Sequence, residues 1–205
     1  MADYTLHCFK DSGNAYKVAL MMTLAGVKWR SVWVDFFKGE TRSDAYREEL
    51  NEMGEVPVLE HNGRKLSQTG VILDYLVEQT GKFAPADRRE GLRWVFWDNH
   101  KLTSYTATYR FLRNFMKDTD PAVLDFLEGR MRAAFKVLDT HLAGRDFMVG
   151  DTLSTADLSI CGYLFFEDEF GVVWSDYPNI AQWLGRIRAV PGWQHPYEML
   201  PDGPV

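Results

Sequence analysis

The stretch Gly54–Leu76, GEVPVLEHNGRKLSQTGVILDYL, decides the fold of this chain. It opens with β-branched and apolar residues, as a strand does. The pair Asn62-Gly63 follows and favours a two-residue hairpin turn, because both positions of that turn need positive φ. After Thr69 the apolar residues recur at the spacing of a helix. The stretch therefore predicts a strand, a tight turn, a second strand and a helix.

Pro57 stands inside the first of these strands, where a proline cannot donate to the ladder of a sheet. It requires a sheet edge, a strand start or a cis bond, and we predict a cis Val56-Pro57 bond over the alternative of a trans proline at an edge. A cis bond would turn the backbone of Val56 towards a cleft. The helix whose free N–H groups begin near Gln68 and Thr69 would face it, and such groups bind anions. These features indicate a site for a peptide-like anion.

The composition is that of a soluble globular protein of one or two domains, with 46% hydrophobic and 25% charged residues in 205. A net charge of −6 without a basic cluster predicts no nucleic-acid partner. No apolar run approaches the ~20 residues of a membrane span, and the N-terminus lacks the apolar core of a signal peptide. Cys8 and Cys161 form no CxxC motif, so we expect neither disulfides nor a metal site. The expected location is the reducing cytoplasm.

The residues before Gly54 add a strand over 4–9, a helix over 16–25 and a strand over 27–34. A strand–helix–strand unit places its two strands parallel. We therefore expect an α/β domain over residues 1–80, with a linker at residues 80–87, where Gly and Pro occur without periodicity.

The remaining residues, 87–205, show no strand pattern and predict an all-helical domain. Apolar residues recur at helical intervals over 91–116, 121–142 and 158–166. Before the last of these helices, Ser154 and Asp157 have the spacing of a reciprocal capping box. We assign that pair a structural role.

Four features carry a resemblance to a known family: Ser12 in the first turn, Glu55-Val56-Pro57 at the third strand, Gln68-Thr69 before the third helix, and GDTLSTADL at residues 150–158. In this order and spacing the chain resembles, from end to end, a cytosolic glutathione transferase, and among these the bacterial theta-like and nu-like types. The resemblance implies a thioredoxin-like α/β N-terminal domain followed by an all-α C-terminal domain. It also implies a homodimeric detoxification enzyme with glutathione as co-substrate.

The resemblance assigns glutathione to the site described above. The backbone of Val56, before Pro57, would pair with the cysteinyl unit like an added strand. Gln68 and Thr69 would hold the glutamyl carboxylate, where the helix dipole adds about 0.3–1 kcal/mol. Glu55 departs from the family, which commonly has Lys or Gln there and so a better partner for the glycyl end. Lys38 and Thr41 in the preceding loop are the residues that could compensate.

The glutathione thiol must ionise to react, and its ordinary pKa is near that of cysteine, about 8.5. A hydroxyl donating to the sulfur beside a helix N-terminus favours the thiolate. Ser12 has that place in the sequence, while Asn14 matches the Thr-x-Asn turn of nu-type members. Either side chain could face the sulfur, and either could cap the helix.

For the electrophile, the resemblance indicates a pocket beside the fourth helix. Tyr105 and Tyr109 share one face of that helix, and Phe165 could close the pocket. The alternatives are that the tyrosines pack in a dimer interface and that Phe165 packs in the core.

The activity predicted from the sequence is conjugation of glutathione to a small hydrophobic electrophile. One alternative is glutathione-dependent disulfide or peroxide reduction, which Asn14 facing the sulfur would favour. Another is a catalytically silent interaction protein with the same fold.

Overall fold

The computed structural model describes residues 3–204, so residues 1–2 and 205 of the expected domains lie outside the described part. The chain forms two compact units. One unit comprises the residues up to Lys82 together with those from Val190 onward, and the other is Phe83–Ala189.

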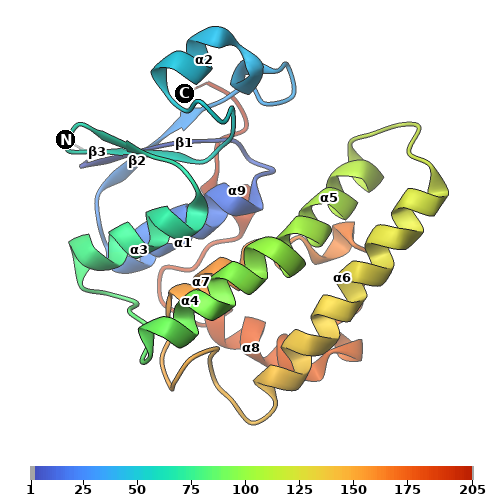
Figure 1. Ribbon diagram of the computed structural model, residues 1–205. Coiled ribbons are helices and arrows are strands. Elements are labelled where there is room, and N and C mark those ends of the chain that lie inside the picture. Colours follow the sequence, from blue (N-terminus) through green and yellow to red (C-terminus); the bar gives the residue numbers. More distant parts are fainter. Residues whose placement is uncertain (1–2, 205) are drawn as a thin grey trace. The chain divides into compact units, whose positions relative to one another are not determined.

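The first unit is built on a four-stranded sheet of order β2-β1-β3-β4 (Figure 1). Its strands are β1 (Tyr4–Cys8), β2 (Trp29–Trp33), β3 (Val58–His61) and β4 (Arg64–Leu66). β1 pairs with β2 in parallel, as the predicted strand–helix–strand unit requires, and β3 is antiparallel to both of its neighbours. The hairpin between β3 and β4 turns at Asn62 (φ 50°) and Gly63 (φ 74°), which confirms the predicted turn with two positive φ angles.

Helices α1 (Gly13–Ala25) and α3 (Thr69–Thr80) lie on one face of this sheet, and α2 (Asp44–Glu49) lies on the other (Figure 1). A short turn of 3-10 helix, η1 (Glu40–Arg42), precedes α2. α1 is buried along most of its length and ends at Gly26, whose φ of 73° is the left-handed conformation that favours glycine. The unit has the thioredoxin-like arrangement expected from the sequence.

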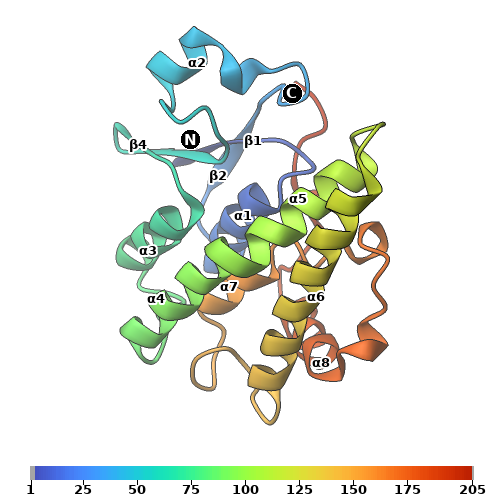
Figure 2. The ribbon, with the colours of Figure 1, turned by 45° about the vertical axis from the view of Figure 1, so that its right-hand side comes forward.

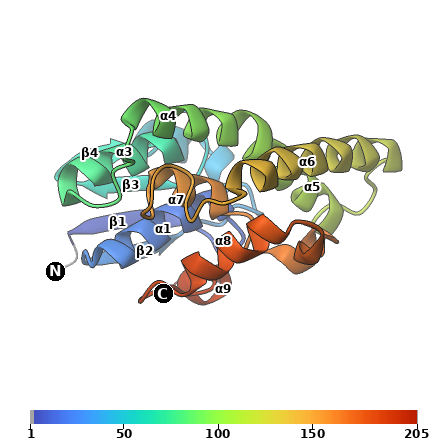
Figure 3. The ribbon, with the colours of Figure 1, turned by 90° about the horizontal axis from the view of Figure 1, so that it is seen from below.

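The second unit contains helices and no strand within its described residues 83–189. Its elements are α4 (Arg88–Trp97), the π-helical segment η2 (Asp98–Leu102), α5 (Thr103–Asn114), α6 (Pro121–Leu142), α7 (Thr155–Cys161), η3 (Glu167–Glu169), η4 (Trp174–Asp176) and α8 (Pro178–Arg188). α5 and α6 run side by side (Figure 2), and α7 lies between α4 and α8 (Figure 3). The all-α C-terminal domain is therefore confirmed as a fold class. No helix within residues 3–204 has the length and apolar character needed to cross a membrane.

The boundaries that differ from those expected include the end of one helix and the division between the two units. The helix expected over 158–166 ends at Cys161, before Gly162, a residue with low helix propensity. The final residues, from Val190, belong to the first unit, although they were expected in the domain 87–205. They include α9 (Pro196–Met199), which packs against α1.

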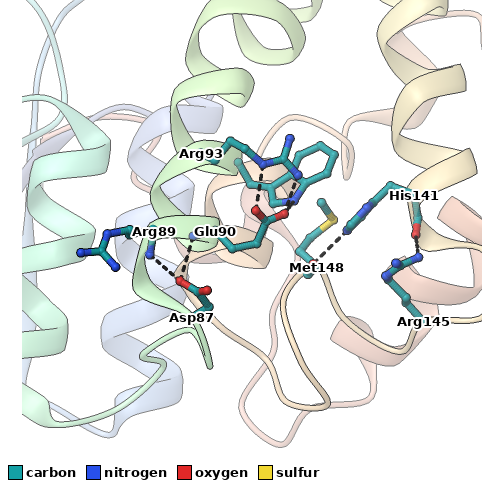
Figure 4. A network of polar contacts seen from close by, with 8 residues as sticks. Asp87, Arg89, Glu90, Arg93, His141, Arg145 and Met148 are labelled. Atoms are coloured by element: carbon teal, nitrogen blue, oxygen red, sulfur yellow. Dashed lines mark hydrogen bonds and ion pairs between the residues drawn. The ribbon is translucent and has the colours of Figure 1, made fainter.

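The capping box predicted at Ser154 and Asp157 is present at the start of α7. The Asp157 carboxylate accepts from the N–H of Ser154 at 2.9 Å and from the N–H of Met148 at 2.8 Å. The carbonyl oxygen of Met148 lies 2.9 Å from Nε2 of His141, at the end of α6 (Figure 4). Met148 thus fixes the loop before α7 through both of its backbone groups: its N–H donates to Asp157, and its carbonyl oxygen contacts His141.

Candidate functional site

Ser12 is the N-cap of α1, directly after β1. Its N–H donates to the carbonyl of Phe9 at 3.1 Å, and its Oγ accepts from the N–H of Ala15 at 3.1 Å. The side chain is 4% exposed. Because Oγ acts as the acceptor in the cap, and no described residue accepts its proton, the hydroxyl can still donate to a ligand. Ser12 therefore combines a hydrogen-bond donor with the positive end of a helix.

Asn14 lies two residues further on, in the first turn of α1. Its Oδ1 atom is buried and has no hydrogen-bond partner among the described residues. Its backbone carbonyl oxygen lies 3.5 Å from Oγ1 of Thr69. This contact places the first turns of α1 and α3 side by side within the first unit.

The Val56-Pro57 bond is cis, as predicted. β3 begins at Val58, so the backbone of Val56 lies outside the ladder of the sheet. The side chain of Val56 packs against the core cluster that contains Val58 and Tyr46. The preceding carbonyl, of Glu55, accepts from the Tyr46 hydroxyl and from Nδ2 of Asn51, each at 3.0 Å. These two hydrogen bonds and the packing of Val56 fix the loop that precedes β3.

Gln68 is the N-cap of α3, and Thr69 is the first residue of that helix. The Gln68 side chain makes no cap; its Nε2 donates to Oε2 of Glu55 at 2.9 Å. The first backbone bond of the helix runs from Ile72 N–H to the Gln68 carbonyl. The backbone N–H groups of residues 69–71 therefore have no partner among the described residues, as is usual in the first turn of a helix.

Gln68 also has a φ of 66°, in the left-handed region that residues with a side chain seldom adopt. Such a conformation costs of order 1–3 kcal/mol and concentrates at ligand-binding sites. Nothing in the sequence signals it, because Gln is not a residue that favours positive φ.

Lys38 and Thr41, the two residues expected to compensate for Glu55, differ in exposure: Lys38 is on the surface and Thr41 is buried. Nζ of Lys38 pairs with Asp35 at 3.2 Å. Thr41 is therefore poorly placed to meet a ligand, and Lys38 is already paired.

The three candidates for the electrophile pocket lie in the helical unit, on α5 and after α7. Tyr109 is 4% exposed, its hydroxyl lies 3.2 Å from Oε2 of Glu128, and Arg113 donates to it at 3.0 Å. Tyr105, one turn earlier, is partly exposed. Phe165 is 1% exposed and lies beyond the end of α7.

The cysteines take no visible part in these arrangements. Cys8 and Cys161 are both buried, and neither forms a disulfide within the described residues. Burial raises the pKa of the Cys8 thiol to about 12, so this residue is a poor nucleophile at neutral pH. Within residues 3–204 no three His, Cys, Asp or Glu side chains are grouped as metal ligands.

Comparisons with known proteins agree with this arrangement. Residues 6–84 match the family of glutathione S-transferase N-terminal domains, and residues 100–191 match that of glutathione S-transferase C-terminal domains. Glutathione S-transferase D6 of Drosophila melanogaster is 30% identical over 194 residues, a match that covers 90% of this chain and 88% of that protein. Disulfide-bond oxidoreductase YfcG of Escherichia coli (strain K12) is 26% identical over 194 residues and covers 89% of each chain.

Among solved structures, a possible glutathione S-transferase from Rhodopseudomonas palustris matches with a TM-score of 0.87 and 32% identity, over 94% of this chain and 89% of that one. The two domain families together account for most of the chain. The chain therefore belongs to the cytosolic glutathione transferase superfamily.

Proposed function

We propose that this protein binds glutathione in its first unit and activates the thiol for conjugation to a small hydrophobic electrophile. The observation that carries the proposal is the meeting of the first turns of α1 and α3, where the carbonyl oxygen of Asn14 lies 3.5 Å from Oγ1 of Thr69. Two helix N-termini, each attractive to negative charge, are thereby brought to one place. A ligand with a carboxylate at one end and a thiolate further along suits such a pair.

The α3 end receives the glutamyl carboxylate. The unpartnered N–H groups of the first turn, including the backbone N–H of Thr69, and the second N–H of the Gln68 amide supply the donors. The cysteinyl unit then lies along the backbone of Val56, outside the ladder of the sheet, and pairs with it as an added strand would.

We assign the glutathione thiol to a position beside the hydroxyl of Ser12. Its hydroxyl donates to the sulfur while the helix dipole of α1 favours negative charge, and both lower the thiol pKa. A hydrogen bond to a charged group is worth about 1.5–3 kcal/mol, or roughly one to two pKa units. The sulfur then attacks the electrophilic carbon as the thiolate, and the leaving group departs with its electron pair.

In the helical unit, Tyr105 is the residue to which we assign contact with the electrophile. We assign Tyr109, one turn further along α5, a structural role, because its hydroxyl is hydrogen-bonded to Glu128 and Arg113. Phe165, which is buried, we assign to the core of the helical unit.

We also propose a homodimer. Several large apolar side chains are exposed on the isolated chain: Phe96 (70%) on α4, Phe126 on α6, and Val71 on α3. Exposed large apolar side chains of this kind would be buried in an interface between two copies of the chain. Sedimentation at micromolar concentration tests this assignment, and a monomer would contradict it.

A second candidate function is glutathione-dependent disulfide reduction. It would be favoured if Asn14, in the same turn as Ser12, donated to the sulfur through its Nδ2 amide; the buried Oδ1 of Asn14 is an acceptor and has no partner among the described residues. The similarity to the disulfide-bond oxidoreductase YfcG adds support. In this reaction the glutathione thiolate attacks one sulfur of a disulfide, a new disulfide forms, and the other sulfur leaves as a thiolate.

The experiment that tests the proposal measures glutathione binding by calorimetry, then turnover with a chlorinated aromatic, a peroxide and a mixed disulfide. We expect binding, and turnover of the chlorinated aromatic that falls in Ser12→Ala. Turnover of the mixed disulfide alone, lost in Asn14→Ala, would assign the reductase activity instead. Absence of glutathione binding would overturn both and leave an interaction protein.

A further inference from the structure

The C-terminal residues return to the turn that carries Ser12. We call residues 193–202 the C-terminal strap. In Figures 1 and 2 it runs past the turn between β1 and α1, to which it is joined in the first unit. The Tyr16 hydroxyl donates to the carbonyl of Gln194 at 2.8 Å, and Nζ of Lys10 donates to Oδ2 of Asp202 at 2.7 Å.

A third contact joins the Tyr197 hydroxyl to Oδ1 of Asp11, at 3.3 Å. The ammonium group of Lys10 also lies over the ring of Tyr197, 5.4 Å from its centre. The strap therefore holds Lys10 and Asp11, on one side of Ser12, and Tyr16, on the other side.

The strap has local structure of its own. α9 begins at Pro196, and Nδ1 of His195 accepts from the N–H of Tyr197 at 3.3 Å as its cap. Its anchor at Tyr16 is fully buried, whereas Asp202 at its far end is largely exposed. The strap is thus fixed at Gln194 and held by weaker, water-accessible contacts beyond it.

Within the turn itself, the N–H of Ser12 donates to the Phe9 carbonyl, its own carbonyl accepts from the N–H of Tyr16 at 2.9 Å, and its Oγ caps the N–H of Ala15. A donor that stabilises a thiolate must keep its position closely, since catalytic groups lose effect with small displacements. We propose that the C-terminal strap positions Ser12 for the glutathione thiol, with Tyr197 and Asp202 as positioning residues that act through Asp11 and Lys10. This inference rests on the proposed activation of the thiol by Ser12.

The test uses the double variant Tyr197→Phe with Asp202→Asn in the full-length protein. Both changes keep the shape of the side chain and remove only the hydroxyl and the charge. One matched control is Asp146→Asn, which breaks a surface ion pair with Arg186 (3.0 Å) in the helical unit. The other is Tyr75→Phe, which removes a hydroxyl bonded to His61 (2.7 Å) in the first unit.

Two quantities are measured. The first is the pKa of the bound glutathione thiol, from the ultraviolet absorbance of the thiolate against pH. We expect the double variant to raise it by about half a unit or more, a threefold loss of thiolate. Glutathione affinity should change little, because the contacts that the double variant removes are with Asp11 and Lys10, which are not assigned to the glutamyl carboxylate. Both controls should leave the thiol pKa unchanged.

The second quantity is hydrogen exchange of the amides of residues 10–16, which requires no ligand. We expect these amides to exchange faster in the double variant than in the wild type, and at the wild-type rate in both controls. If the wild type does not bind glutathione, the proposed function fails, while exchange still decides whether the strap holds the turn. Unchanged exchange overturns the inference, as does an unchanged thiol pKa in a protein that binds glutathione.

Discussion

The side-chain amide of Gln68 donates to the carboxylate of Glu55 at 2.9 Å. This contact joins the loop before the cis Val56-Pro57 bond to the N-cap of α3. The two segments proposed to hold the cysteinyl and glutamyl units of glutathione are therefore linked at the surface through the side chain of Gln68. It also sets a negative charge beside the place proposed for a carboxylate.

We predict that Glu55→Gln strengthens glutathione binding. The substitution removes a negative charge near a ligand that carries two carboxylates, while the amide can still bond to Gln68. Because Glu55 is exposed, the gain is about 0.2–1 kcal/mol, at most roughly fivefold in Kd, and declines with salt. Calorimetry at low and high salt measures it. Weaker binding would instead show that Glu55 accepts from the glutamyl amino group.

Ser12→Ala should affect both stability and chemistry. Loss of the cap to Ala15 destabilises the protein by about 0.5–2 kcal/mol. Ser43→Ala is the matched control, because Ser43 caps α2 through the N–H of Tyr46 at 3.2 Å. Urea unfolding should show a similar loss in both variants, and only Ser12→Ala should slow conjugation. Equal slowing in the two variants would reduce the role of Ser12 to that of a cap.

Tyr105→Phe and Tyr109→Phe should distinguish a residue that contacts the electrophile from one that stabilises the helical unit. Tyr109→Phe removes the bonds to Glu128 and Arg113 and costs roughly 1.5 kcal/mol of stability. Tyr105→Phe should leave stability unchanged and alter the ratio of kcat/KM between electrophiles. Turnover of a panel of chlorinated aromatics, with thermal unfolding of each variant, measures both effects. The reverse pattern would place Tyr109 at the substrate.

His141 should contribute to acid sensitivity. Burial lowers its pKa, and the cations Arg145 and Arg93 act in the same direction, outweighing the Met148 carbonyl and Glu90. The unfolded chain therefore binds the proton more readily, so stability is full above the ordinary value of about 6.5 and is lost as the pH falls below it.

In His141→Gln the amide can still donate to Met148, and the loss of stability on acidification should be smaller. The exposed His100→Gln serves as the control. Urea unfolding across this pH range measures both variants. If stability falls with pH as steeply in His141→Gln as in the wild type, the acid sensitivity would instead belong to the buried histidines His7 and His61.

The fold could be predicted where the chain carries strong local signals. Asn62-Gly63 specified the hairpin because few residue pairs accept two positive φ angles. Pro57 specified a departure from the sheet ladder because it lacks an N–H. The capping box at Ser154 and Asp157 has a spacing that few other structures require.

Other features could not be predicted because they depend on contacts between distant residues. The positive φ of Gln68 and its bond to Glu55 arise only when the loop and α3 meet. The last residues return to the first unit through contacts such as the hydrogen bond between Tyr16 and Gln194, 178 positions away. The engaged hydroxyl of Tyr109 likewise depends on a residue of another helix, Glu128.

The central claim is that the protein lowers the pKa of the glutathione thiol, and titrating the ultraviolet absorbance of bound thiolate tests it most directly. We predict a bound thiol pKa at least about one unit below the ordinary value of about 8.5. Ser12→Ala should return it towards that value, and Asn14→Ala should leave it low. A thiol that titrates in the wild-type complex as it does in free solution would contradict the claim.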